Sequence, residues 1–378
     1  MNSFFLATEG ASDFICIFSF RIREIEFFTN SARMLKQLQV LLSLVLLTGF
    51  SKAQEIKILN TRKEVSLRGL SVVSDRTVWV SGSGGMVSVS TDGGNNWRWM
   101  QVPAYPKSDF RSIVAFSDQE AVIASTTDPA VILRTTDGGK TWNTVFKDTA
   151  KSVFLDALDI SDDYGVVVGD PENGKIFFAE TTDRGMTWKK AGTSRFATTT
   201  TDETFFAASG SNIRLTPFMN RDAGYRVALV SGGKKSCLYI STGLNNTARC
   251  YSLIINQGKE TSGANSIAIN PADPNQAFIV GGDFSQDRFR HGNSARIQID
   301  PFTQRSPLEP PHGYRSCVEY LNDKQLICCG QSGVDMSDDG GITWKLISNT
   351  GFHVCRKAKA GNIIFLAGPH GTIAALKL

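Results

Sequence analysis

The charged residues best suited to chemistry recur at one place in a repeated sequence pattern. Arginine follows an apolar or aromatic residue at the start of three strand-like stretches, in Leu-Arg-Gly, Phe-Arg-Ser and Tyr-Arg-Ser. Guanidinium and carboxyl groups that converge can hold an anionic or carbohydrate-like ligand by charge-assisted hydrogen bonds. They can also pair with one another and lock neighbouring sheets together, which is the interpretation that we prefer. The candidate binding residues are Arg68, Arg111, Asp156, Glu203, Arg315 and His353.

Catalytic patterns are scarce in this sequence. The glycine-rich stretch at 82–88 lies in a predicted hairpin without a following helix, so it lacks the helix N-terminus that binds dinucleotide phosphates. The four histidines are scattered, and no His/Cys/Asp cluster has metal-ligand spacing. We therefore expect no catalytic residue, no cofactor and no metal, and favour a protein that is not an enzyme. The alternative is a glycoside hydrolase, sialidase- or xyloglucanase-like, with two carboxylates across a cleft.

One eight-residue pattern, Ser/Thr-x-Asp-x-Gly-x-x-Trp, occurs four times. Its residue types suit a tight chain reversal, because the Asp side chain accepts hydrogen bonds from backbone N–H groups and Gly adopts backbone angles that other residues resist. The Trp then buries on the order of 200 Å² of ring surface against its own blade. We interpret these boxes as structural: Asp92, Gly94, Trp97, Asp137, Gly139, Trp142, Asp183, Gly185, Trp188, Asp339, Gly341 and Trp344.

The boxes belong to a longer repeat of strands. An alternating strand, a polar turn and a second strand precede each box, and the same phrase returns without a box further along the chain. The spacing of about 45 residues is typical of propeller blades, and the mature length accommodates seven of them. We therefore predict an all-β, seven-bladed β-propeller. The last blade lacks an outer strand, and residues 55–59 are predicted to supply it and close the ring.

The ends of the chain predict export. Residues 34–53 combine a basic start, an apolar run and a small-residue exit, as in a secretory signal peptide. Residues 1–33 look like an over-extended start, which leaves residues 54–378 as a single propeller domain. The expected location is periplasmic or extracellular, with no stable membrane anchor after cleavage. The net charge of +4 is too small to indicate a nucleic-acid partner.

The cysteines of the mature region permit disulfides without requiring them. Cys237 and Cys250 flank one predicted hairpin and are the pair to test first, although buried free thiols are an equal alternative. Cys328 and Cys329 are adjacent on a predicted strand, so they must point to opposite faces.

The boxes match the BNR, or Asp-box, repeat, and the chain as a whole resembles the photosystem II stability/assembly-factor-like family. It is especially similar to bacterial exported members often labelled oxidoreductase or glycosyl hydrolase. The phrases that carry the resemblance include LRGLSVVSDRTVWVSGSGGMVSVSTDGGNNW, FFAASGSNIRL, YRSCVEYL and FHVCRKAKAGNIIFLAGPHGTI. The resemblance implies a seven-bladed propeller used as a binding or assembly platform for a protein partner, with a carbohydrate or anionic small ligand as a further possibility. Units four and five depart from the pattern because they lack a box.

Overall fold

The computed structural model describes residues 55–60, 64–150, 153–172, 174–191, 202–218, 224–242 and 248–377. The predicted over-extended start (1–33) and signal peptide (34–53) lie outside these residues. Within the described ranges, no helix is both long enough and apolar enough to cross a membrane.

Seven antiparallel sheets follow one another along the chain, beginning with three regular ones. The first contains β2 (Leu67–Val72), β3 (Val78–Gly82), β4 (Met86–Ser90) and β5 (Arg98–Gln101). The second contains β6 (Phe110–Ala115), β7 (Ala121–Ser125), β8 (Ala130–Thr135) and β9 (Asn143–Asp148). The third contains β10 (Leu155–Ser161), β11 (Tyr164–Glu172), β12 (Lys175–Thr181) and β13 (Lys189–Lys190).

The other four sheets include the two irregular ones and the sheet that joins the ends. The fourth contains β15 (Ile213–Pro217), β16 (Tyr225–Val230), β18 (Cys237–Thr242) and β19 (Arg249–Ser252). The fifth contains β20 (Ser262–Ile269), β21 (Gln276–Asp283), β22 (Ser294–Gln298) and β23 (Thr303–Arg305), extended by β17 (Gly232–Gly233) and β14 (Glu203–Thr204). The sixth contains β24 (Cys317–Tyr320), β25 (Leu326–Gly330), β26 (Gly333–Ser337) and β27 (Lys345–Ser348). The seventh contains β28 (Val354–Lys357), β29 (Ile363–Ala367), β30 (Ile373–Lys377) and β1 (Lys57–Asn60), and two short 3-10 turns are η2 (Phe284–Gln286) and η3 (Pro369–Gly371).

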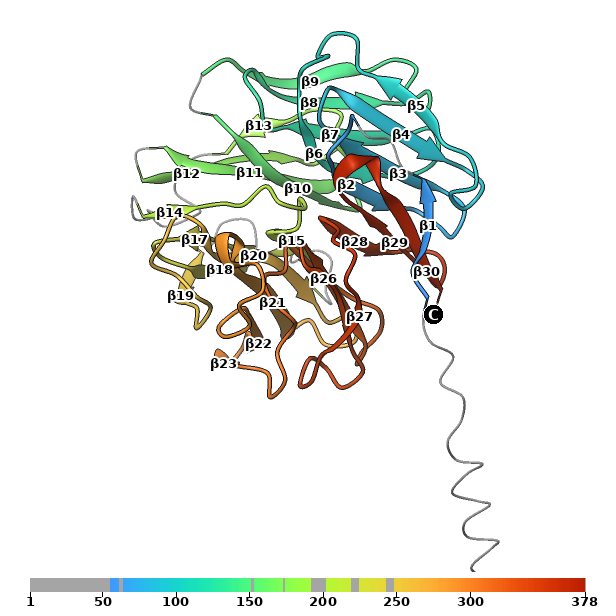
Figure 1. Cartoon of the computed structure of the whole chain (residues 1–378). Helices are drawn as coiled ribbons and strands as arrows, with labels where there is room; N and C mark the ends of the chain where they lie inside the picture. Colours follow the sequence, from blue (N-terminus) through green and yellow to red (C-terminus); the bar gives the residue numbers. More distant parts are fainter. Residues whose placement is uncertain are drawn as a thin grey trace, which may run out of the picture. The chain divides into compact units, whose positions relative to one another are not determined.

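The sheets stand as blades around a ring (Figure 1). The first strand of each blade contacts the first strand of the next, and β2 contacts β28, so the ring is closed. At the outer edge of the seventh sheet β1 pairs antiparallel with β30, with Lys57 opposite Ala375. The prediction of a seven-bladed all-β propeller is confirmed, and the strand nearest the described N-terminus completes the last blade.

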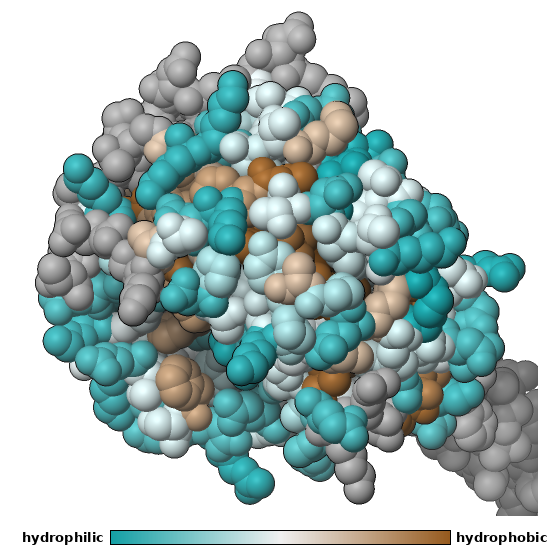
Figure 2. Space-filling view, turned by 90° about the horizontal axis from the view of Figure 1, so that it is seen from above, coloured by the Kyte–Doolittle hydropathy of each residue, from teal (hydrophilic) through white to brown (hydrophobic). Residues whose placement is uncertain are grey.

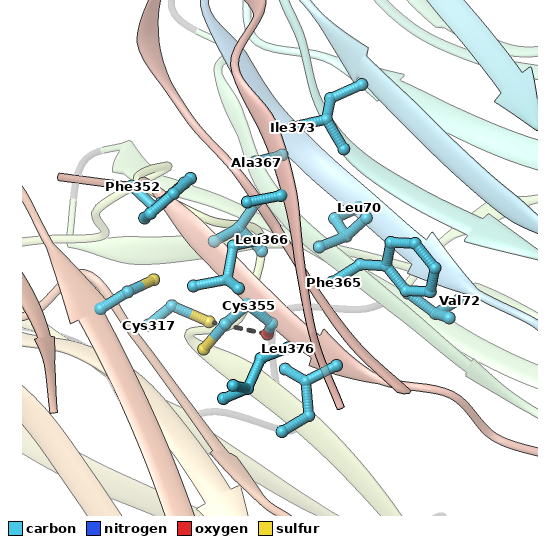
Figure 3. Close-up of a cluster of buried hydrophobic side chains, with 14 of the residues drawn as sticks. Leu70, Val72, Cys317, Phe352, Cys355, Phe365, Leu366, Ala367, Ile373 and Leu376 are labelled. Carbon is cyan, nitrogen blue, oxygen red and sulfur yellow. Dashed lines mark hydrogen bonds between the residues drawn. The ribbon is translucent and has the colours of Figure 1, made fainter. Parts of the chain in front are cut away.

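Apolar side chains fill the spaces between neighbouring blades. Figure 3 shows one such cluster, in which residues of the seventh blade such as Phe365 and Leu366 pack beside Leu70 of the first blade and Cys317 of the sixth. Cys328 and Cys329 belong to two different clusters, as their opposite directions require. Each blade is therefore held mainly by its two neighbours.

The boxes fasten the turn between the third and fourth strands of a blade. In the second blade the Asp137 carboxylate accepts hydrogen bonds from the Thr141 hydroxyl (2.6 Å) and backbone N–H (2.9 Å). The Thr135 hydroxyl oxygen accepts one from the Gly139 N–H at 2.8 Å. These bonds, led by the Thr141 hydroxyl, lower the pKa of Asp137 to about 2. The other three boxes repeat the arrangement.

The box tryptophans also join neighbouring blades, which corrects the prediction that each packs against its own blade. Trp142 of the second blade meets Trp79 of the first edge to face, with ring centroids 6.4 Å apart. Trp344 of the sixth blade lies with its ring centroid 5.1 Å from that of Phe278 in the fifth. Because the sheets stack face to face, a box at the outer turn covers the gap to the preceding blade.

Candidate functional site

One segment of the chain fills part of the central channel between the innermost strands. Within residues 205–212, which lead from β14 to β15, Ser209 Oγ donates a hydrogen bond to Ser316 O of the sixth blade at 2.7 Å. Ser211 Oγ donates one to Ser266 Oγ of the fifth blade, also at 2.7 Å, and both serines are buried. We call residues 205–212 the plug. It separates a plugged end, where the innermost strands begin, from an open end, where they finish.

Two of the predicted arginines lie at the plugged end and bind the plug. Arg68 Nη1 donates a hydrogen bond to the Ala208 carbonyl at 3.1 Å, and Arg111 Nη1 donates to the Ala207 carbonyl at 3.5 Å. Arg111 Nε also pairs with Asp109 at 2.7 Å. The hydrogen-bonding groups of these arginines are therefore directed at the chain itself, which is the arrangement expected of residues that hold the fold.

Two further predicted residues, His353 and Asp156, lie at the same end, in environments that disfavour the charged form of each side chain. His353 Nδ1 lies 2.9 Å from the Leu67 carbonyl oxygen, and burial, with Arg68 next, lowers the pKa of His353 to about 4. Asp156 is fully buried, and the backbone N–H groups of Asp170 and Ala207 beside its carboxyl offset that burial only in part. Burial, reinforced by Asp170, raises the pKa of Asp156 well above its ordinary range. A substrate has no access to this carboxyl while the plug is in place.

The structure places Arg315 elsewhere, so the prediction that it matches Arg68 is wrong. A Cβ added to Gly82 would lie 2.1 Å from the Ser66 carbonyl oxygen, and one added to Gly330 would lie 2.2 Å from that of Tyr314. Tyr314 thus corresponds to Ser66, and Arg315 corresponds to the residue before Arg68. A shift of one residue turns a strand side chain to the opposite face.

Arg315 consequently lies inside the sixth blade as half of a buried ion pair. Its side chain and that of Asp335 are both 0% exposed, and Nε lies 2.6 Å from Asp335 Oδ2. The second oxygen of Asp335 lies 2.6 Å from His312 Nδ1, and Arg315 Nη1 donates to Ser332 Oγ at 3.0 Å. Arg315 therefore ties together strands of its own blade rather than two neighbouring blades, and its buried guanidinium offers no surface to a ligand.

Glu203 also fails to reach the channel, contrary to the prediction. It lies on β14, which pairs with β17, and its side chain points into the fourth blade. Glu203 Oε2 accepts hydrogen bonds from Ser231 Oγ at 2.8 Å and from the Tyr239 hydroxyl at 2.5 Å. Lys235 Nζ lies 3.7 Å from the other carboxyl oxygen. Glu203 precedes the innermost strand of the fourth blade in the sequence, which suggested a position at the channel. The pairing of β14 with β17 instead directs its side chain into the fourth blade.

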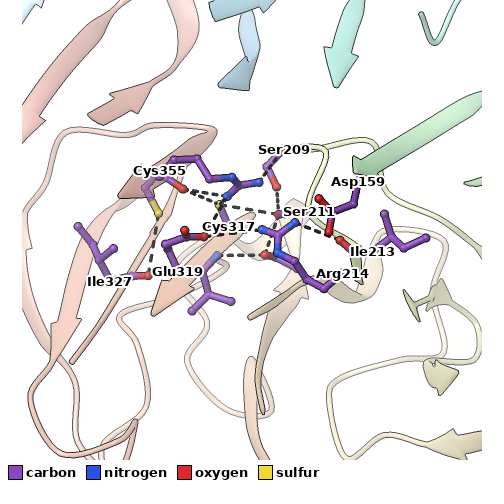
Figure 4. Close-up of polar contacts among 12 residues, drawn as sticks. Asp159, Ser209, Ser211, Ile213, Arg214, Cys317, Glu319, Ile327 and Cys355 are labelled. Carbon is purple, nitrogen blue, oxygen red and sulfur yellow. Dashed lines mark hydrogen bonds and ion pairs between the residues drawn. The ribbon is translucent and has the colours of Figure 1, made fainter. Parts of the chain in front are cut away.

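A cluster of charged side chains lines a hollow at the open end of the channel. Glu319 lies between two guanidiniums, with Arg214 Nη2 and Arg356 Nη1 each 3.7 Å from its Oε2. Asp159 stands beside them and accepts a hydrogen bond from the Leu215 N–H at 2.8 Å, and Figure 4 shows Asp159, Arg214 and Glu319 facing one another. We call Asp159, Arg214, Glu319, Arg356, Lys357 and Lys359 the channel charge cluster.

The channel charge cluster carries an excess of positive charge in a confined space. It lines a hollow of about 170 Å³, with Ser209 and Gly210 of the plug also in its wall. A second hollow of about 650 Å³ adjoins it, since Ile160 and Lys359 line both. Burial raises the pKa of Glu319 against the opposing effect of Arg356. Four basic and two acidic side chains therefore face a concave surface of moderate size.

The sequence analysis missed this cluster although a signal was present. Asp159, Glu319 and Arg356 occupy the same register position on the innermost strands of three blades. Each pairs with a residue of the second strand that lies three places before a glycine: Val166 before Gly169, Ile327 before Gly330, and Phe365 before Gly368. Each interrupts the apolar alternation of its strand. Aligning the repeats at this position, rather than at the strand start, would have found the open end of the channel.

Comparison with known proteins agrees with this architecture. The family model described as photosynthesis system II assembly factor YCF48 matches residues 49–151, and that of the BNR/Asp-box repeat matches residues 336–346. No curated protein sequence is significantly similar to the chain.

Solved propellers align over most of the chain at low identity. The structure titled "YCF48 bound to D1 peptide" is 15% identical with a TM-score of 0.59, over 86% of this chain and 97% of its own. YCF48 from Cyanidioschyzon merolae is 16% identical with a TM-score of 0.59, over 85% and 98%. The WD40 propeller domain of Doa1 is 12% identical with a TM-score of 0.58, over 86% and 97%. The chain is thus a β-propeller with Asp-box repeats that is similar to the YCF48-type photosystem II assembly factors.

Proposed function

We propose that the chain is an exported binding or assembly platform, with residues 54–378 as its mature domain, and that it engages a protein partner at the open end of its channel. The observation that carries this proposal is the channel charge cluster, where basic groups outnumber acidic ones on a concave, solvent-facing surface. Figure 2 shows one face of the molecule, on which hydrophobic side chains form patches among hydrophilic ones. Recognition of a partner by its charged groups fits such a surface better than a purely apolar contact.

A partner peptide that presents a carboxylate suits this site. Arg214 and Arg356 already share Glu319, and the exposed Lys359 adds a cation where the two hollows meet. The structural neighbour solved with a D1 peptide supports a peptide as ligand, because it shares the propeller architecture. A small anionic or carbohydrate ligand would use the same groups. The hollow of about 170 Å³ alone is below the roughly 300–1,000 Å³ usual for small-molecule sites, so such a ligand would also have to occupy the adjoining hollow of about 650 Å³.

The glycoside hydrolase alternative has weaker support. A general acid and a second carboxylate must be free to face the glycosidic bond. Glu319 is instead held between two guanidiniums, and Asp159 already accepts a backbone hydrogen bond. At the plugged end Asp156 is out of reach of solvent.

Panning of random dodecapeptides against the immobilised full chain tests the platform. We expect enriched peptides to be acidic, and their affinity to fall roughly tenfold or more in Lys359→Met, because a charge-assisted hydrogen bond is lost. Lys107→Met is the matched control, since Lys107 is an exposed lysine that lines neither hollow. Equal losses in both variants, or no enrichment, would contradict the proposal. Release of p-nitrophenol from aryl glycosides would support the hydrolase instead.

A further inference from the structure

Two cysteines of the fourth blade lie side by side on its outer strands. Across the β18–β19 ladder Cys237 pairs with Ser252, and Cys250 pairs with Tyr239. Positions two apart on a strand share a face, so both thiols project from the same face as diagonal neighbours. Their Sγ atoms are 3.1 Å apart. Formation of a bond of about 2.05 Å therefore needs an approach of only about 1 Å.

The two thiols differ in access, as an attacking and a resolving cysteine do. Cys250 is exposed on the outermost strand, whereas Cys237 is fully buried. The hydrogen bond with Cys237, followed by the nearby Lys235, lowers the pKa of Cys250 to about 7 against the opposing effect of burial. Exposed thiolates of low pKa beside a second thiol are the ones that react with oxidants and disulfides.

The fourth blade also lacks the Asp box that fastens the corresponding pair of strands in four other blades. In the first, second, third and sixth blades an Asp box ties the turn between the third and fourth strands. In the fourth blade these strands are β18 and β19, and Ala248 stands where the box has its tryptophan. The residues between them, 243–247, lie outside the described part of the chain.

We propose that Cys237 and Cys250 are a reversible dithiol–disulfide pair, with Cys250 as the attacking group, and that their disulfide fastens β18 to β19 in a blade that has no Asp box. The remaining described cysteines do not compete for this role. Cys317, Cys328, Cys329 and Cys355 are all 0% exposed, so a reagent in solution cannot reach them in the folded protein.

The oxidant is a disulfide of a small thiol or of a thiol–disulfide exchange protein. The Cys250 thiolate attacks one sulfur of that disulfide, which forms a mixed disulfide and expels the first thiolate. The Cys237 thiol then loses its proton and attacks Cys250 Sγ, which expels the second thiolate. Two electrons and two protons pass in total from the cysteine pair to the oxidant, which leaves as two thiols. Glu203 Oε1, 3.9 Å from Cys237 Sγ, lies within reach of the proton released in the second step.

Oxidation of the purified full chain by glutathione disulfide tests the pair. We expect one linked peptide joining Cys237 to Cys250, reversed by dithiothreitol, and a first-step rate that rises with pH through about 7. The thermal midpoint of the oxidised protein should exceed that of the reduced protein by roughly 3–6 °C, since a short loop is closed between two strands. Absence of the linked peptide, or a linked protein no more stable than the reduced one, would overturn the proposal.

Single variants separate the two roles. Cys237→Ser should accumulate a glutathione adduct on Cys250, because the resolving thiol is gone. Cys250→Ser should form no adduct, because the remaining thiol, that of Cys237, is fully buried. Cys328→Ser is the control, since Cys328 lies at full burial in another cluster. An adduct on Cys237 in Cys250→Ser would reverse the assignment. Circular dichroism of each variant shows whether it is folded. The linked peptide found in the chain without substitutions tests the pair independently of any variant.

Discussion

Replacement of Arg315 by methionine tests whether this arginine locks a blade or serves a ligand. Methionine has a similar length and no charge, so Arg315→Met removes the guanidinium with little change of shape. What remains is Asp335, whose side chain is 0% exposed and whose Oδ2 loses its partner at 2.6 Å. The carboxylate retains His312, whose Nδ1 lies 2.6 Å from Oδ1 and whose backbone N–H donates to the same oxygen at 3.2 Å.

The expected cost follows from that burial. Removing one partner of a fully buried ion pair leaves an uncompensated charge and typically costs about 3–5 kcal/mol. Arg68→Met is the matched control, because Arg68 is only half-buried and donates a single hydrogen bond to a plug carbonyl. Loss of that bond should cost about 0.5–1.5 kcal/mol. The two arginines, similar in sequence context, should therefore differ severalfold in their effect on the free energy of unfolding.

Urea unfolding followed by tryptophan fluorescence measures both variants against the unchanged protein. The double variant Arg315→Met/Asp335→Asn should recover part of the loss, because no buried charge is left without a partner. Equal destabilisation by Arg315→Met and Arg68→Met, or no recovery in the double variant, would refute the account of Arg315 as a buried structural group.

Two further predictions concern the plugged end and the boxes. Because burial raises the pKa of Asp156, the folded state binds a proton more tightly than the unfolded state; stability therefore falls as pH rises from the ordinary Asp pKa of about 4 towards the folded value. Asp156→Asn should remove this fall and be the more stable protein at pH 7 in thermal unfolding; an unchanged pH profile would contradict the reasoning. In the sixth-blade box, Gly341→Ala should destabilise clearly more than Gly340→Ala. Both glycines have positive φ (80° and 72°), but a Cβ at Gly341 would lie 2.3 Å from Phe278 Cε2, whereas one at Gly340 meets nothing within 4 Å. Equal urea midpoints for the two would show that the box does not pack against the preceding blade.

The sequence alone determined the architecture and the turn-fastening role of the boxes, but not which blade their tryptophans contact. Both depend on local information: the alternation of apolar residues, the repeat spacing and the turn chemistry of Asp, Gly and Trp. The Asp137 carboxylate bonds only within its own turn, so its function could be derived from neighbours in the sequence. The count of blades followed because each repeat is one unit of structure.

Only the tertiary structure decided what faces the channel. The strands that carry Arg68 and Arg111 have a register shift at those residues, between Leu67 and Gly69 and between Phe110 and Ser112. The ladder of the sixth blade begins after Arg315, at Cys317, so similar tripeptides turned opposite ways. A bulge adds one residue and reverses the alternation, and residue order does not reveal it.

The plug could not be predicted from the sequence for a related reason. Residues 205–212 belong to an irregular unit without a period, and their partners, such as Ser266 and Ser316, are distant along the chain. The channel charge cluster likewise assembles from the third, fourth, sixth and seventh blades. Local patterns set the blades because turns and strands close over a few residues. The site was set by contacts between blades, which exist only once the ring has closed.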